Sequence, residues 1–159
     1  MSKTYREGPI GALMDEYERA AKDLQKLLRT IDDATYTRIL DTQTKDKDCR
    51  SIESVMNHVV RAGYGYSNYI RKQFGEEFVE RKTYYEVGTP KLAIAELNKV
   101  LKYTEENLSN KWKISWRKIQ GNIIHTTWGQ DFDMDQLMEH AIVHILRHRR
   151  QIEKLLLNA

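Results

Sequence analysis

The five histidines, His58, His125, His140, His144 and His148, are the residues in this chain best suited to chemistry. The last three are spaced four residues apart. Side chains at this spacing lie on adjacent turns of an α-helix, so two of these imidazoles can reach one ion. Neutral imidazole is a good ligand for zinc, nickel, iron and copper. A third histidine from another helix would complete a site with one open position, the arrangement that suits catalysis.

Positions around the helix indicate which histidines face the core. At about 100° per residue, one face of the last helical segment is formed by Leu137, Ala141, Ile145, His148, Ile152 and Leu155. His148 lies within this apolar stripe, His144 lies near its edge, and His140 lies roughly 120° from its centre. The predicted inward pair is therefore His144 and His148. His58, at the flank of the apolar side of an earlier helix, is the natural third ligand.

The alternative for each histidine is an ordinary structural role. A single histidine on a helix is more often a hydrogen-bonded core or surface residue than a ligand, and the four-residue spacing also occurs on solvated helices. His125 has no partner at a suitable spacing and is not predicted to be a ligand. The sequence predicts that His140 is a surface residue, with a role beside the metal or in proton transfer as the alternatives.

Four helical patterns must position these side chains. Apolar residues recur at three- and four-residue spacing over about 10–31, about 52–70, about 92–110 and about 134–157. Ser51 is a plausible N-cap for the second helix, Thr89 followed by Pro90 is a start signal for the third, and Asp133 with Gln136 resembles a capping box for the fourth. The predicted fold is an all-α four-helix bundle, with a single domain over residues 1–159.

The segment 111–129 interrupts the helical pattern. Trp112, Ile114 and Trp116 alternate with polar residues, and Gly121-Asn122 separates them from a second run at 123–128. This pattern predicts a short irregular or strand-like segment between the third and fourth helices. The three tryptophans, with Trp128 as the last, either close the site or simply pack that segment.

Composition excludes several classes of protein. The chain has 159 residues, 40% hydrophobic and 31% charged, and its net charge of +3 is scattered. No apolar stretch approaches the roughly 20 residues of a membrane span, and no dense basic face indicates nucleic-acid binding. One cysteine and no secretory signal at the N-terminus favour the cytoplasm.

Two segments of this chain resemble the DinB/YfiT-like superfamily. They are Ser54-Val55-Met56-Asn57-His58-Val59-Val60 and His144-Ile145-Leu146-Arg147-His148-Arg149-Arg150-Gln151-Ile152. Their order, separation and helix placement agree with that superfamily over essentially the whole chain. The resemblance implies a four-helix bundle, often a homodimer, with a divalent metal ion, commonly zinc or nickel, on His58, His144 and His148. It also implies a metalloenzyme whose small-molecule substrate is a low-molecular-weight thiol, as in thiol-dependent S-transferases.

Two other functions remain open. One is metal-dependent hydrolysis, because a metal with an open position also activates water. The other is a non-catalytic bundle that binds a metal, a ligand or a partner in the response to stress. A substrate-sized cavity beside the metal would favour an enzyme, whereas a site filled by side chains would favour a binding protein.

Other side chains have weaker claims to function. Cys49 precedes the second helix, whose N-terminus can lower the pKa of a thiol. Tyr64, Tyr66 and Tyr69 either line a pocket or belong to the core, and Glu53 and Glu139 either support a ligand imidazole or face solvent. The cluster Arg147, Arg149 and Arg150 either attracts a carboxylate-bearing thiol or forms a solvated face.

Overall fold

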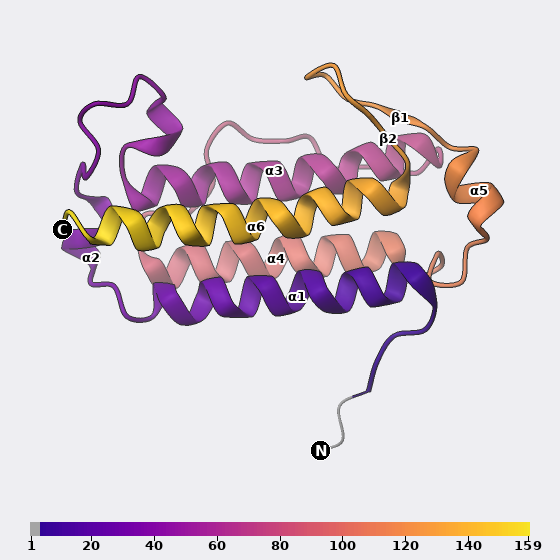
Figure 1. Ribbon diagram of the computed structural model, residues 1–159, viewed down its shortest axis with the longest axis horizontal. Helices are drawn as coiled ribbons and strands as arrows, with labels where there is room; N and C mark the ends of the chain where they lie inside the picture. Colours follow the sequence, from indigo (N-terminus) through magenta and orange to yellow (C-terminus); the bar gives the residue numbers. More distant parts are fainter. Residues whose placement is uncertain (1–3) are drawn as a thin grey trace.

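Four long helices dominate the computed structural model, which describes residues 4–159 (Figure 1). They are α1 (Gly8–Leu28), α3 (Ile52–Gln73), α4 (Pro90–Leu108) and α6 (Met134–Leu156). Helix α1 packs against α4 and α6, and α3 packs against the same two helices, so α1 and α3 lie at opposite corners. The predicted all-α bundle is confirmed.

The capping residues predicted from the sequence start three of these helices. The side chains of Ser51, Thr89 and Asp133 accept hydrogen bonds from the backbone N–H groups of Ser54, Leu92 and Gln136. Each bond satisfies an N–H group that has no partner within its helix. The predicted bounds of the four helices differ from the observed bounds by only a few residues, because helices fray at both ends.

The connection between α3 and α4 runs back along α3. Asn68 Nδ2 donates to the carbonyl of Val79 at 2.8 Å, and Asn57 Nδ2 donates to the carbonyl of Thr83 at 3.1 Å. Asn57 Oδ1 in turn accepts from the N–H of Tyr85 at 3.0 Å. The chain therefore returns towards the end of the bundle at which α3 begins, and α4 starts there (Figure 1).

Short elements lie at the two ends of the bundle. Helix α2 (Asp33–Thr37) and the 3₁₀ helix η1 (Lys47–Cys49) lie in the connection that leads to α3, and α5 (Trp116–Gln120) and a hairpin lie before α6. In the hairpin, β1 (Ile124–His125) pairs antiparallel with β2 (Asp131–Phe132). Only part of the expected strand-like segment is therefore extended.

The prediction of a strand-like segment is wrong around Trp116, where the chain forms a short helix. Ser115 accepts a hydrogen bond from the N–H of Lys118, which starts a single helical turn that buries Ile119. The alternation of Trp112, Ile114 and Trp116 spans too few residues to specify a strand, and the local cap decides the conformation. Trp116 itself is 54% exposed.

All four long helices contribute to one hydrophobic core. Fully buried side chains include Met14 and Leu24 of α1, Met56 of α3, Leu97 of α4 and Leu137 of α6. Within residues 4–159, no helix combines the length and the apolar character needed to cross a bilayer.

Candidate metal centre

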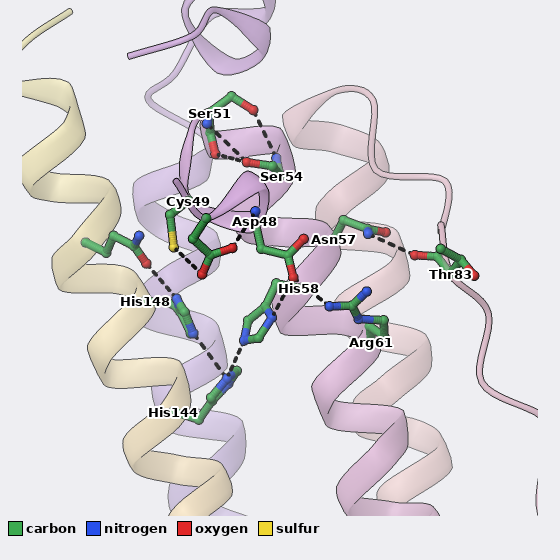
Figure 2. A network of polar contacts seen from close by, with 12 residues as sticks. Asp48, Cys49, Ser51, Ser54, Asn57, His58, Arg61, Thr83, His144 and His148 are labelled. Atoms are coloured by element: carbon green, nitrogen blue, oxygen red, sulfur yellow. Dashed lines mark hydrogen bonds and ion pairs between the residues drawn. The ribbon is translucent and has the colours of Figure 1, made fainter. Parts of the chain in front are cut away.

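His58 lies in the second turn of α3, and the start of that helix fixes its position. Ser51 and Ser54 form a reciprocal capping box, with each backbone N–H donating to the other side chain at 3.1 Å. Val55 and Val59 are buried against the core on the same helix. Because these two valines fix the rotation of α3, His58 is held at the flank of the buried face, pointing towards α6 (Figure 2).

The other two histidines lie one turn apart on α6. Ala141, Ile145 and Ile152 are buried, and they orient the helix so that His144 and His148 face α3. The predicted inward pair therefore does face inward. None of the three imidazoles is fully exposed.

The Nε2 atoms of the three histidines converge. His144 Nε2 lies 3.0 Å from His58 Nε2 and 3.1 Å from His148 Nε2. All three ligand atoms lie within 4.8 Å of one another. Nitrogen atoms that bind one zinc ion tetrahedrally at about 2.0–2.1 Å are about 3.3 Å apart, so the spacing fits a single small divalent cation.

The outer nitrogens of two rings have partners that orient them. His58 Nδ1 lies 3.3 Å from Asp48 Oδ2 (Figure 2). His148 Nδ1 lies 2.8 Å from Gln151 Oε1. The oxygens of Asp48 and Gln151 can only accept a hydrogen bond from the ring. Each Nδ1 therefore carries the proton, and each Nε2 is left with its lone pair. Arg61 donates to the same oxygen of Asp48 at 2.6 Å and keeps that carboxylate in place.

Burial keeps the α6 imidazoles neutral. Burial, followed by the charges of the neighbouring His148 and His58, lowers the pKa of His144 to about 2. Burial also lowers the pKa of His148, against the opposing effect of its hydrogen bond to Gln151. Neutral imidazole is the form that binds metal, so these residues are ready to bind at neutral pH.

The family model for the DinB family matches residues 1–159, the whole chain. The chain belongs to the DinB family. No curated protein and no solved structure matches it significantly. Family membership and the three-histidine group together are compatible with a metal-binding protein. Binding of an ion by His58, His144 and His148 stays a prediction.

The remaining histidines of this DinB protein lie outside the cluster. His125 is exposed on β1 and pairs with Asp131 at 2.7 Å. The ring of His140 lies 6.4 Å from that of His144 and stacks on Trp128 at 6.0 Å. It is half-buried, and burial followed by the charge of Arg147 lowers its pKa. The prediction of a surface residue is therefore wrong for His140, because the hairpin covers it.

A pocket with a volume of about 710 Å³ lies beside the centre. Its walls come from α3, the α3–α4 connection, the hairpin and α6, and they include His58, Tyr66, Tyr69, Trp128 and His140. Small-molecule sites commonly have volumes of about 300–1,000 Å³. The volume therefore suits a small-molecule ligand within reach of His58.

Sequence reasoning missed the two partners of the imidazoles. Gln151 lies three residues after His148 on one helix, so helical spacing was a usable signal. Asp48 lies in the polar loop before α3, where no helical spacing relates it to His58. Glu139 is exposed, and no hydrogen bond joins Glu53 or Glu139 to a histidine of the described chain.

Three further candidates have structural roles or lie elsewhere. Burial raises the pKa of Cys49, which is opposite to the lowering that a helix N-terminus can cause, although a hydrogen bond to Gln151 opposes the rise. Tyr64 stacks on Tyr85 at 5.2 Å, away from the histidines. Trp112 is half-buried against the core. Of the three tryptophans, all within residues 4–159, Trp128 is the one that lines the pocket.

Proposed function

We propose that this DinB protein is a divalent-metal-dependent enzyme that activates a low-molecular-weight thiol for transfer to an electrophilic small molecule. The observation that carries the proposal is the convergence of three imidazole Nε2 atoms beside a pocket of about 710 Å³. A site filled by side chains would instead favour a non-catalytic binding protein. Zinc or nickel is the proposed metal, because both bind neutral imidazole.

The chain supplies the ligands and their orientation. His58, His144 and His148 present lone pairs from two helices, while Asp48 and Gln151 hold the outer ring nitrogens of His58 and His148. A divalent ion held there would offer an open coordination position that favours thiolate over thiol near neutral pH. His58 lines the pocket, so a ligand in the pocket would approach the three-histidine group from the side of His58.

The reaction is a substitution at the electrophile. The thiol loses its proton to solvent, its sulfur forms a bond to the electrophilic carbon, and the leaving group departs with its bonding electrons. The pocket holds the electrophile close to the sulfur, which lowers the entropic part of the barrier.

The first experiment measures metal content and thiol dependence together. Protein purified without a histidine tag is subjected to elemental analysis, then assayed with several thiols and electrophiles before and after chelation. We expect about one divalent ion per chain and turnover that needs both the metal and the thiol. Equal rates in the two forms would rule out metal-assisted thiol transfer.

The same assays separate the competing function. Metal-dependent ester or amide hydrolysis without thiol would establish a hydrolase instead. His125→Ala is the matched control, because His125 is exposed and does not belong to the cluster. It should retain both metal and activity, whereas His58→Ala should lose both, since two imidazoles from one helix leave the ion weakly held.

A further inference from the structure

The pocket is lined by cationic side chains and by no carboxylate. Arg61, Arg81, Lys82 and Arg147 all contribute to its walls, whereas no aspartate or glutamate within residues 4–159 does. The chain as a whole is nearly balanced, with 26 basic and 23 acidic residues. The positive lining is therefore a local feature of this pocket and not a consequence of overall charge.

Three of these cations have no carboxylate partner. Arg61 is paired with Asp48 at 2.6 Å, but no ion pair is formed by Arg81, Lys82 or Arg147 among residues 4–159. Arg149, a close neighbour of Arg147 on α6, behaves differently and lies 3.5 Å from Glu153. An arginine at a pocket wall without a partner is free to bind an anionic group with two parallel hydrogen bonds.

Gly65 allows Arg81 to approach α3 closely. A Cβ atom at position 65 would lie 2.9 Å from Nη1 of Arg81, so any larger residue would push the guanidinium away. Arg81 belongs to the connection that Asn57 and Asn68 hold against α3. The positive charge of Arg81 is thus brought to the α3 wall of the pocket.

Tyr66 adds a neutral donor between these charges. It is 8% exposed and lines the pocket, and its hydroxyl has no hydrogen-bond partner among the described residues. The hydroxyl can therefore donate a hydrogen bond to an acceptor in the pocket.

Trp128 supplies an apolar surface on the hairpin side. Its ring is 44% exposed and contacts Tyr66 and Tyr69 edge-on, at centroid distances of 6.2 and 5.5 Å. Tyr69 holds the hairpin in place, because its hydroxyl accepts from the N–H of Thr127 at 2.8 Å. A flat or apolar part of a ligand can lie against this indole.

We infer that the pocket binds a small molecule with an oxyanion group, a carboxylate or a phosphate, held between Arg81 and Arg147 with a hydrogen bond from Tyr66. The rest of the ligand lies against Trp128. The inference rests on the proposed function, in which this pocket receives the substrate, and it assigns a charge to that substrate. Binding of the oxyanion to the two arginines does not require the metal.

The test uses three small aromatic probes, benzoate, phenyl phosphate and neutral benzamide, titrated calorimetrically into metal-stripped and metal-loaded protein. At least one anion should bind the metal-stripped protein at least about tenfold more tightly than benzamide, and added salt should weaken its binding. Whichever anion binds more tightly identifies the oxyanion as carboxylate or phosphate. Equal affinities for the anions and benzamide would overturn the inference, as would anion binding to the metal-loaded form alone.

Matched variants identify the residues responsible. Arg147→Gln and Arg81→Gln should each weaken binding of the anion at least about tenfold, whereas Arg150→Gln, an exposed arginine of α6 outside the pocket, should not. Equal affinity in the Arg147→Gln and Arg150→Gln proteins would contradict the inference. Circular dichroism monitors folding, and Arg147→Lys keeps the charge if the glutamine variant fails to fold.

Elemental analysis of the same proteins separates the two proposals. Normal metal content with no preference for anions would overturn only the oxyanion site. Anion binding in a protein that never acquires a metal would overturn only the proposed metalloenzyme.

Discussion

Gln151 Oε1 accepts a hydrogen bond from His148 Nδ1 at 2.8 Å, one turn further along the same helix. This contact fixes the tautomer of His148 and directs its Nε2 lone pair towards His144. Side chains that hold the outer nitrogen of a metal-binding histidine commonly account for a factor of about 10–100 in metal affinity.

The first prediction follows from this contact. Gln151→Ala should weaken zinc binding by about 10–100-fold, because the ring of His148 is then free to rotate and to change tautomer. Gln151→Glu should retain most of the affinity, since a carboxylate also accepts from Nδ1. Competition with a coloured zinc chelator measures both values, and an alanine variant with unchanged affinity would contradict this role.

The second prediction concerns the ligands themselves. His144→Ala and His148→Ala should each release the bound ion, because the remaining imidazoles cannot hold it tightly. His125→Ala should keep it. Elemental analysis after gel filtration is the measurement. Full occupancy in the His148→Ala protein would show that His148 is not a ligand, and metal held by His140 with His144 would contradict the helical-face assignment.

The third prediction concerns the stability of the metal-free protein in acid. His144 has a native pKa of about 2, below the value of about 6.5 in the unfolded chain. Below about pH 6.5 the unfolded state therefore binds more protons, so stability is retained above that pH and lost as the pH falls. At about pH 5.5, the titration of this one residue lowers the free energy of unfolding by about 1.4 kcal/mol.

Urea unfolding of chelated protein at about pH 7.5 and about pH 5.5 measures this loss. The His144→Gln protein lacks the titrating group. Its free energy of unfolding should therefore fall between the two pH values by about 1.4 kcal/mol less than that of the unchanged protein. The lowered pKa of His148 adds a loss of the same sign in both proteins. Equal losses in the two proteins would show that His144 is not held neutral by burial.

The fourth prediction is a homodimer formed through helix faces. Val143 and Leu146 on α6 are 44% and 40% exposed, which leaves apolar surface outside the core of one bundle. Light scattering at micromolar concentration should give twice the mass of the chain. A monomer mass under those conditions would rule out the dimer.

Helix starts and the inward histidines could be predicted because they depend on local patterns. A cap such as Ser51 or Asp133 acts within one turn, and helical spacing alone places His144 and His148 on the inner face. The pocket could not be predicted in this way. Arg81 reaches it only because the α3–α4 connection folds back along α3, and Asp48 reaches His58 from a loop. Such contacts depend on tertiary packing between segments without a periodic pattern.

Two asparagines of α3 hold a connection that carries Arg81, Lys82 and Thr83 to the wall of the pocket. None of these three residues contributes to the histidine cluster or to the buried core. Arg81, one part of the proposed oxyanion site, is thus encoded in a stretch of the chain that carries none of the three clustered histidines. A different α3–α4 connection, held against α3 by the same Asn57 and Asn68, would change the charge of this pocket wall and leave the three histidines in place.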